Sequence, residues 1–296
     1  MLRRMKAMFV HAHFDDYEFT AAGTFELWRR TVPNFWARVV VCTDGCAGHH
    51  FHTREETGAI RMQEQLESAR LGDYEFEPLR LPDGSIPREA CLQNTIELHA
   101  ALWKAIRDFE PDYLFCPPLA GDTLAGIHND HQTVAESVRR VAYMINVPHA
   151  FTPEYPADER LSTPCKVPVI VNVYDSYMSG ANACDLVVDV EDAFGTIAEL
   201  SWCHQSQIRE WLPWVGRHQL NPPADLEEWS ASLRQRFERK SRELDLPAGR
   251  AAEVFRITAW GTVPRVEDLV RDFPPLLEGG PGLGALEQRL ERWRGE

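Results

Sequence analysis

The sequence predicts an α/β protein with a Rossmann-like, mostly parallel sheet, helices on both faces of that sheet and a C-terminal extension. Two observations support this fold class. Short apolar runs such as Met8–Val10 and Tyr113–Cys116 are typical of strands buried on both faces, as parallel strands are. Amphipathic stretches of helical length alternate with these runs, which is the pattern of a doubly wound sheet with right-handed crossovers.

The expected strands are short runs rich in apolar and β-branched residues. The third is expected at an edge of the sheet, because Pro78 cannot donate to a neighbouring strand. In chain order the strands are Met8–Val10, Ala37–Cys42, a strand within Tyr74–Leu81, Tyr113–Cys116, Val169–Tyr174 and Leu186–Val190.

The expected helices carry apolar residues at helical spacing, as Leu98, Leu102 and Ile106 do. Gly72 stands where a helix often stops. In chain order the helices are Phe19–Arg30, Arg54–Leu71, Leu92–Phe109, His131–Tyr143, Phe194–Trp211 and the highly charged Ala224–Leu244.

We expect one domain over residues 1–262 and a C-terminal arm over residues 263–296. The arm contains Pro274-Pro275 and the glycine-rich Gly279–Gly282, followed by a short amphipathic helix, Leu286–Trp293. Such an arm could pack on a neighbouring subunit, and a homo-oligomer is one expectation for the assembly.

Composition sets limits on the class of protein. The chain has 296 residues, 44% hydrophobic and 26% charged, which is enough apolar material for a sizeable core. Its net charge of -14 argues against nucleic acid or an anionic membrane as a partner. No apolar run has the length of a transmembrane helix or of a signal-peptide core, so we expect a cytoplasmic protein.

The seven cysteines are an odd number without regular spacing. Cys42 and Cys116 lie in apolar strands and are expected to be small buried hydrophobes. Cys42 and Cys46 have nearly the spacing of zinc ligands but no second pair nearby, so a separate zinc site there is not expected.

A first cluster of polar residues follows the first expected strand, in the segment His11–Glu18. The carboxyl ends of strands in open α/β sheets are where ligands bind. Zinc accepts imidazole nitrogen and carboxylate oxygen, so His13 and Asp16 could bind one ion and leave Asp15 as a general base. The alternative is that the two aspartates only cap the next helix.

A second cluster, His128-Asn129-Asp130-His131, follows the fourth expected strand. Two short His/Asp clusters at equivalent strand ends are hard to explain by capping alone. Asp130 could also be the N-cap of the helix His131–Tyr143, and this role is compatible with catalysis.

Together the clusters resemble the signatures of the PIG-L/LmbE-like N-acetylglucosaminyl deacetylases, AHPDDE near the amino terminus and HPDH or HxDH about a hundred residues later. This chain has Ala12–Tyr17 for the first signature and His128–His131 for the second. Further segments resemble the family in order and spacing: Val39–Gly45; Arg61, Glu64, Ala69, Leu71 and Gly72; Leu81–Gly84; Phe109–Asp112; His204–Gln207; and Ala252–Phe255.

The resemblance implies roles for particular residues. His13, Asp16 and His131 match the three zinc ligands of the family, although ferrous iron accepts the same donors. Asp15 matches the general base, and His128 the residue that stabilises the oxyanion or protonates the leaving amine. Asp130 matches the carboxylate that orients that histidine. The looser matches are Arg61 and Asp83, which lie near positions that hold sugar hydroxyls in relatives.

The chain departs from the family pattern at three positions. Phe14 replaces the usual proline, Tyr17 the usual glutamate, although Glu18 follows, and Cys46 a common acidic residue. The substrate could therefore differ from that of relatives.

Other histidines have simpler explanations. His49, His50 and His52 are expected to be exposed loop residues, with extra metal ligands or substrate contacts as the alternative. His204, within an expected helix, is expected to be a hydrogen-bonded structural residue.

The first functional hypothesis is a zinc-dependent amidohydrolase that removes the acetyl group of an N-acetylglucosamine-type amino sugar or its conjugate. The runner-up is a zinc amidase for a larger N-acyl group or a non-sugar conjugate. The hypothesis from another class is a catalytically impaired metal-binding or interaction protein. Loops that bind substrate vary within such folds, so the sequence does not name the conjugate.

Overall fold

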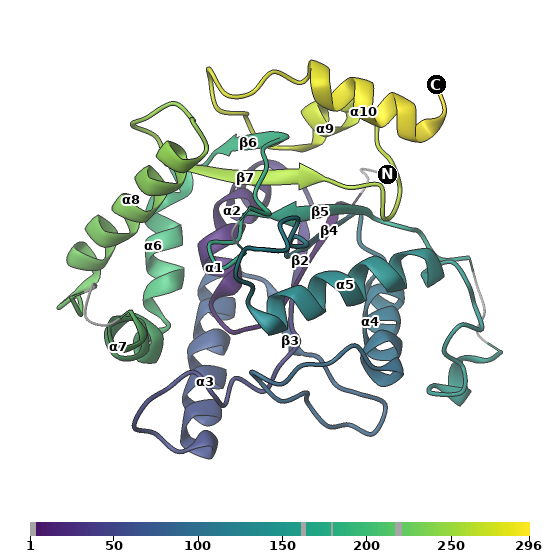
Figure 1. Ribbon diagram of the computed structural model, residues 1–296, viewed down its shortest axis with the longest axis horizontal. Helices are drawn as coiled ribbons and strands as arrows, with labels where there is room; N and C mark the ends of the chain where they lie inside the picture. Colours follow the sequence, from purple (N-terminus) through teal and green to yellow (C-terminus); the bar gives the residue numbers. More distant parts are fainter. Residues whose placement is uncertain (1–3, 161–163, 179, 217–220) are drawn as a thin grey trace.

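The computed structural model describes residues 4–160, 164–178, 180–216 and 221–296. Within them a single seven-stranded sheet has the order β3-β2-β1-β4-β5-β7-β6, and helices cover it on both sides (Figure 1). Strands β1 to β5 run parallel to one another, whereas β7 is antiparallel to both β5 and β6. The predicted Rossmann-like, mostly parallel fold is confirmed.

The strands have the following bounds: β1 Lys6–His11, β2 Trp36–Val41, β3 Glu75–Pro78, β4 Tyr113–Cys116, β5 Val169–Val173, β6 Leu186–Asp189 and β7 Ala252–Ile257. Six of these strands overlap the expected ones. β3 lies at the edge of the sheet, as expected from the proline at position 78. β7 was not predicted as a strand.

The helices have the following bounds: α1 Asp16–Thr20, α2 Ala22–Thr31, α3 Arg54–Gly72, α4 Ile96–Phe109, α5 Asn129–Met144, α6 Phe194–Trp202, α7 Leu212–Val215, α8 Leu226–Glu243, α9 Val266–Asp272 and α10 Gly284–Arg294. Short 3₁₀ turns span Pro156–Asp158 and Glu191–Ala193, and a π-helical stretch spans Ser206–Trp211.

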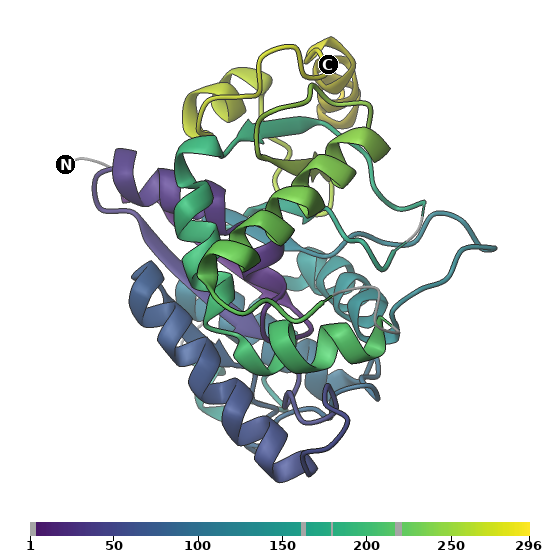
Figure 2. The ribbon, with the colours of Figure 1, turned by 90° about the vertical axis from the view of Figure 1, so that its left-hand side faces the viewer.

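Alternate residues of β1 feed two different hydrophobic layers, because successive side chains of a strand point to opposite faces of the sheet. Ala7 and Phe9 belong to the layer that also contains residues of α2, α6 and α8. Met8 and Val10 belong to the layer formed with α4 and α5. Figure 2 shows α6 and α8 lying side by side on the first of these faces. The parallel core is therefore buried on both sides.

Local sequence signals fix several helix ends. Thr53 and Glu56 form a capping box at the start of α3, in which each side chain accepts from the other residue's backbone. Thr95 caps α4 and Asp225 caps α8 in the ordinary way, with the side chain accepting from a backbone N–H three residues on. α3 ends with Asp73 in the left-handed conformation, one residue beyond the predicted stop at Gly72.

Two expected helices are interrupted. The first breaks at Ala21, whose backbone is not helical, into α1 and α2. The second, expected over Phe194–Trp211, stops at Trp202, and the chain turns at Cys203 and His204 before the π-helical stretch begins. Local periodicity does not predict either break.

The C-terminal segment 263–296 contains α9 as well as the expected terminal helix, here α10. Both helices lie over the β6–β7 end of the sheet (Figure 1). Leu269, Phe273, Leu286 and Leu290 are buried in the same hydrophobic layer as β1 and α2. In addition, the indole N–H of Trp28 donates to the carbonyl of Asp272 at 2.6 Å. The segment thus packs on its own chain.

The described segments contain neither a helix that could span a membrane nor a disulfide bond. None of the described helices combines the length and the apolar character that crossing a bilayer requires. All seven cysteines are free, and Cys42 and Cys116 are fully buried, as expected.

Candidate metal and catalytic site

The two His/Asp clusters meet at the carboxyl edge of the sheet. His11 ends β1, and His13, Asp15 and Asp16 occupy the turn into α1. The second cluster begins α5: His128 is its N-cap residue, and Asp130 and His131 lie in its first turn. Asp130 is therefore not the N-cap that one alternative proposed. The crossover that follows β4 brings the clusters together, because β1 and β4 are neighbouring parallel strands.

The three predicted metal ligands converge on one point. Nδ1 of His13 lies 3.0 Å from Nε2 of His131, and these two atoms lie 3.5 and 3.6 Å from Oδ2 of Asp16. Ligand atoms about 2.0–2.1 Å from a tetrahedral zinc ion would be about 3.3 Å apart. The donor set and its spacing therefore fit a divalent metal ion.

The other ring nitrogen of each histidine contacts a carboxylate. Nδ1 of His131 lies 2.6 Å from Oδ2 of Asp175, and Nε2 of His13 lies 3.2 Å from Oδ2 of Asp130. Partners of this kind fix the orientation of metal-binding imidazoles and raise their basicity. Both nitrogens that face the centre are thereby presented to a single ion.

Asp16 is held as an anion. Its Oδ2 atom lies 2.5 Å from Nδ1 of His11 and accepts the backbone N–H of His13 at 2.8 Å. Burial opposes ionisation of Asp16, but His11 and His131 outweigh it and hold its pKa well below the usual range. The carboxyls Asp130 and Asp16 in turn raise the pKa of His13 to about 10 against its burial. A metal ion would have to displace that proton.

Asp15 stands beside the three ligands without contacting any of them in a hydrogen bond within the described segments. Its backbone has a φ of 89°, in the left-handed region that aspartate tolerates better than most residues. Burial raises its pKa to about 7, although Arg61, 3.8 Å away, opposes this. A carboxyl with a pKa near neutrality suits a general base.

His128 lies next to the ligands, with its ring centroid 4.7 Å from that of His13 and 4.4 Å from that of His131. The expectation that Asp130 orients His128 is wrong, because Asp130 contacts His13 and accepts the backbone N–H of Ala90 and of Leu92. Burial and the two neighbouring histidines lower the pKa of His128 to about 4. His128 is accordingly neutral at pH 7.

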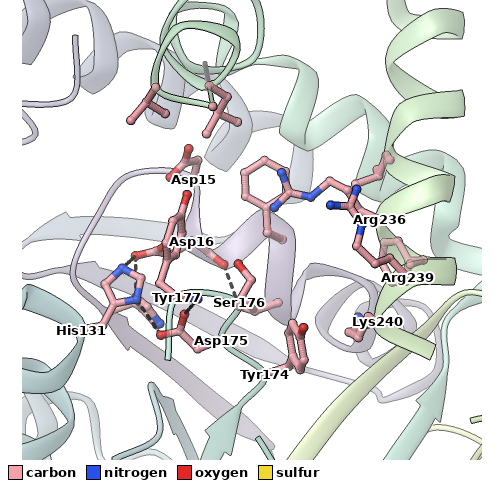
Figure 3. Close-up of a pocket in the computed structure, with 18 residues that line it drawn as sticks. Asp15, Asp16, His131, Tyr174, Asp175, Ser176, Tyr177, Arg236, Arg239 and Lys240 are labelled. Carbon is pink, nitrogen blue, oxygen red and sulfur yellow. Dashed lines mark hydrogen bonds and ion pairs between the residues drawn. The ribbon is translucent and has the colours of Figure 1, made fainter. Parts of the chain in front are cut away.

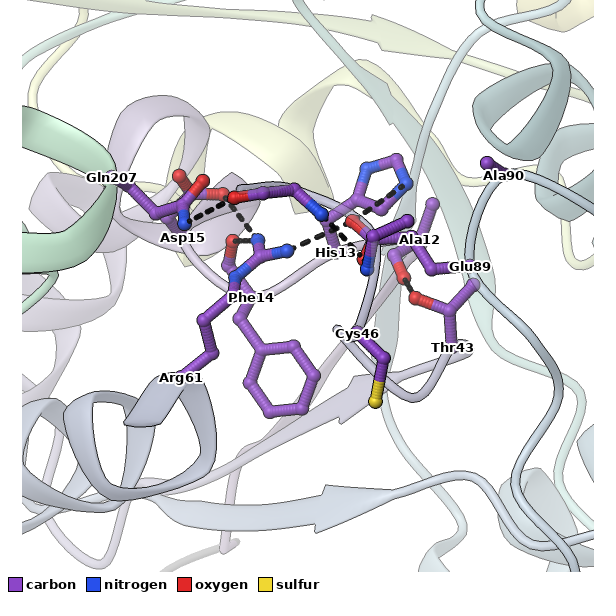
Figure 4. A network of polar contacts seen from close by, with 12 residues as sticks. Ala12, His13, Phe14, Asp15, Thr43, Cys46, Arg61, Glu89, Ala90 and Gln207 are labelled. Atoms are coloured by element: carbon purple, nitrogen blue, oxygen red, sulfur yellow. Dashed lines mark hydrogen bonds and ion pairs between the residues drawn. The ribbon is translucent and has the colours of Figure 1, made fainter. Parts of the chain in front are cut away.

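Arg61 supports the site from below (Figure 4). It is 2% exposed and donates to the carbonyl of Phe14 and to Glu89, both at 2.8 Å. Glu89 also accepts the backbone N–H groups of Ala47 and Gly48. These contacts give Arg61 a structural role in the described segments, and its contact with substrate stays a prediction.

Asp83 does not join the site. It lies exposed in a turn and accepts from the backbone N–H and the hydroxyl of Ser85, at 2.9 and 2.6 Å. Its carboxylate stabilises that turn, and nothing in the described contacts brings it to the metal ligands. The position of Asp83 in a loop of the sequence could not show whether its side chain would reach the metal ligands.

Two of the three departures from the family pattern, Phe14 and Tyr17, have structural explanations. Phe14 is fully buried, and its ring lies against Gly45, where no Cβ could fit. Tyr17 is part of the core and packs against Phe9 and Phe25. Phe14 and Tyr17 thus serve packing in this chain.

Glu18 forms a buried polar hub next to the site. Its Oε1 atom accepts hydrogen bonds from the hydroxyl of Ser68, from Nε2 of Gln65 and from the hydroxyl of Tyr74, at 2.6–2.9 Å. His204 lies 3.4 Å from the same oxygen. His204 is fully buried beside Glu18, as a structural residue would be, but neither of its ring nitrogens has a hydrogen-bond partner among the described residues, so the predicted hydrogen bonding is not observed.

The histidine loop differs from expectation at one position. His49 was expected to be exposed, but its side chain is 1% exposed and its Nε2 atom lies 2.8 Å from Glu210. His50 stacks on Trp214 with an angle of 3° between the rings. His49, His52 and Glu210 could hold an ion. The His49–Glu210 contact explains their proximity without one.

A pocket of about 390 Å³ opens onto the site. Asp15, Asp16 and His131 line one side, and Arg236, Arg239 and Lys240 of α8 lie on the other (Figure 3). Its volume falls within the range of small-molecule sites.

Sequence reasoning missed Asp175, His11 and the cations of α8. Asp175 had the same signal as the residues that were found, since it follows the buried strand β5 at its carboxyl end. Nothing in the sequence marked the cations of α8 as site residues, because the charged side chains of a helix normally face solvent.

Residues 8–142 match the model of the PIG-L family, described as GlcNAc-PI de-N-acetylase. No curated protein sequence matches the chain significantly. Among solved structures, the N,N'-diacetylchitobiose deacetylase of Pyrococcus horikoshii is 22% identical, with a TM-score of 0.65 over 86% of this chain and 84% of that one.

Two other solved structures have similar folds. The 4-carboxy-2-hydroxymuconate hydratase of Pseudomonas putida is 15% identical, with a TM-score of 0.61 over 88% of this chain and 98% of that one. A triple mutant of a deacetylase from the teicoplanin pathway is 10% identical, with a TM-score of 0.52 over 86% and 99%. At these identities the likeness establishes the fold. Function must be argued from the site, since one of these folds serves a hydratase.

Proposed function

We propose that this protein is a metal-dependent hydrolase that removes the N-acetyl group from an N-acetylglucosamine-type amino sugar or its conjugate. The match of residues 8–142 to the PIG-L family model supports this proposal. The observation that carries the proposal is the convergence of His13, Asp16 and His131 at separations of 3.0–3.6 Å beside the carboxyl of Asp15, which is hydrogen-bonded to none of the three in the described segments. The deacetylase neighbours named above support the same reaction class.

The metal ligands would be Nδ1 of His13, Oδ2 of Asp16 and Nε2 of His131. Zinc is the proposed ion, and ferrous iron is the alternative that accepts the same donors. Such an ion, when bound, supplies Lewis acidity that activates water and polarises an acyl carbonyl.

Asp15 acts as the general base. Its carboxylate accepts a proton from the attacking water and can return that proton to the departing amine. Arg61 and the backbone bond from Asp15 to Gln65 at 3.3 Å hold it in place. Burial raises its pKa to about 7 in the ion-free protein, and a bound cation would lower that value.

His128 assists as a neutral imidazole. Its ring contacts the rings of His131 and Tyr177, whose centroids are 4.4 and 5.7 Å away. A neutral imidazole carries one N–H, which can donate a hydrogen bond to the oxyanion that develops on the acetyl group. This role replaces the protonated His128 that the sequence suggested.

The test is acetate release by the zinc-reconstituted full chain from N-acetylglucosamine, N,N'-diacetylchitobiose and N-acetylglucosamine conjugates. We expect acetate and free amine in equal amounts, loss of both after chelation and recovery on adding zinc. Absence of acetate from every compound, with one zinc bound per chain, would overturn the proposal and favour the larger-acyl amidase or the impaired protein.

A further inference from the structure

We propose that the side of the pocket opposite Asp15 is a subsite for an anionic group of the substrate, a carboxylate or a phosphate, bound by Arg236 and Lys240 of α8. This inference rests on the proposed function, because it specifies the class of amino-sugar derivative that the same pocket would accept. It would favour derivatives that carry a carboxylate or phosphate over neutral sugars.

The first argument is placement. Arg236 and Lys240 are four residues apart on α8 and so lie on the same side of the helix, and both line the pocket that contains Asp15, Asp16 and His131. Figure 3 shows them across the pocket from that group. A ligand whose acetamide lay at Asp15 would extend toward them.

The second argument is that their charges have no partner. Among the residues that the structure describes, no carboxylate lies within 4.0 Å of Arg236 or Lys240, and neither side chain takes part in a hydrogen bond. By contrast, Arg234 of the same helix donates to both oxygens of Glu191, at 2.7 and 2.8 Å.

The third argument is burial. Lys240 is 7% exposed, and burial lowers its pKa to about 8. Glu253 is the carboxyl whose charge acts most strongly on Lys240, but its two oxygens accept the backbone N–H groups of Gly23 and Thr24. A buried cation without a partner is costly, and an anionic ligand would offset that cost.

Aromatic rings position both cations without neutralising them. The Arg236 guanidinium lies 4.3 Å from the ring centroid of Phe19, and the Lys240 ammonium lies 4.2 Å from that of Phe237. Arginine can bind a carboxylate or phosphate through two parallel hydrogen bonds, and lysine adds a point charge. The pair therefore has the chemistry of an oxyanion subsite.

Binding is tested first, independently of catalysis. Inorganic phosphate and malonate are titrated calorimetrically into the zinc-loaded full chain and into Arg236→Gln and Lys240→Met. We expect at least tenfold weaker binding of the preferred anion in each variant. Arg242→Gln removes an exposed charge from the same helix and is the matched control, which should bind as the parent does.

A thermal-shift series guards against misfolded variants. Lys240→Met should unfold at the same or a higher temperature than the parent, because it removes a buried unpaired charge. Phosphate or malonate should raise the Tm of the parent and of Arg242→Gln, and raise that of Lys240→Met much less. Equal anion stabilisation of the parent and Lys240→Met would overturn the proposal.

Substrate preference gives the second readout. We expect kcat/KM for N-acetylglucosamine 6-phosphate or N-acetylmuramic acid to exceed that for N-acetylglucosamine at least tenfold, and Arg236→Gln to reduce this ratio. The better of the two charged compounds identifies phosphate or carboxylate. Turnover with equal preference for neutral and charged compounds would refute the subsite alone, whereas anion binding without acetate release would refute only the proposed function.

Discussion

Nδ1 of His131 lies 2.6 Å from Oδ2 of Asp175, and both side chains are 2% exposed. The backbone N–H of Tyr177 and the side chain of Asn182 hold the Asp175 segment in turn. The Nε2 atom of His131 is therefore directed to the metal position by a carboxylate from the segment that follows β5. The site depends on β5 as much as on β1 and β4.

Asp175→Asn should weaken zinc binding about 10–100-fold, because the amide is a poorer partner for the N–H of His131 and lowers its basicity. Zinc affinity is measured by competition with a chelator of known strength. Asp245→Asn is the control, since Asp245 is exposed and its left-handed backbone tolerates asparagine. Unchanged affinity in Asp175→Asn would argue against His131 as a ligand.

Asp15→Asn should retain one zinc per chain and lose activity by about 10²–10⁴-fold, the usual contribution of a general base. Asparagine fits the left-handed backbone at this position, so the fold should be kept. Metal content is measured by mass spectrometry and turnover by acetate release. Loss of zinc in this variant would instead identify Asp15 as a ligand.

The pH profile distinguishes the two roles considered for His128. Asp15 must be ionised to act as a base, so kcat/KM should fall as the pH drops below its pKa, which is about 7 without metal and lower beside a bound cation. His128 has its pKa lowered to about 4 and stays neutral throughout. We therefore expect no loss of kcat/KM between pH 7 and 8. A decline there that is absent in His128→Gln would support a protonated His128.

Glu18→Gln should lower the free energy of unfolding by about 3 kcal/mol, because it leaves His204 charged and buried without its partner. Urea unfolding at pH 6 measures the change. Glu67→Gln, which removes an exposed carboxylate paired with Arg70, should change it by less than about 0.5 kcal/mol.

The ion pair between Glu18 and His204 should stabilise the folded protein over a limited pH range. The pKa of Glu18 is lowered by His204 against burial, so its contribution is present above 4.5 and is lost as the pH falls. The pKa of His204 is raised by Glu18 against burial, so its contribution is present below 6.5 and is lost as the pH rises through the folded-state value. The difference in Tm between the parent and Glu18→Gln should therefore be larger at pH 6 than at pH 9.

Gly45→Ala should destabilise the protein by about 2–4 kcal/mol, since it adds left-handed strain and drives a methyl group into the ring of Phe14. Gly84→Ala is a matched control, because Gly84 has a similar positive φ of 85° with open space around it. Its cost should be that of the backbone alone, about 1–2 kcal/mol. If Gly45→Ala and Gly84→Ala lowered the Tm equally, the side chain of Phe14 would move aside without a cost in stability.

The sequence predicted the parallel half of the sheet well, because strands buried on both faces have a clear apolar signature. β1, β2 and β4 follow directly from it. The same reasoning placed His13, Asp16 and His131 together, since the carboxyl ends of neighbouring parallel strands share one edge.

The remaining features depend on contacts that local patterns do not encode. The break at His204 reflects a buried partner, Glu18, that is distant in sequence. Arg61 could not be assigned from its position in the helix, because Glu89 and Phe14 enclose it from other segments. The partner of Asp130 could not be assigned from its own segment, because its carboxylate contacts His13, which is distant in sequence.

The position of β7 between β5 and β6 has a consequence for biosynthesis. During translation, β6 leaves the ribosome more than sixty residues before β7, the one named strand in the described part of the chain with which it pairs. Until Ala252–Ile257 emerges, β5 and β6 both expose unpaired edges to other nascent chains. Completion of the sheet is thus a late, long-range event, and this interval is where a chaperone would be most useful.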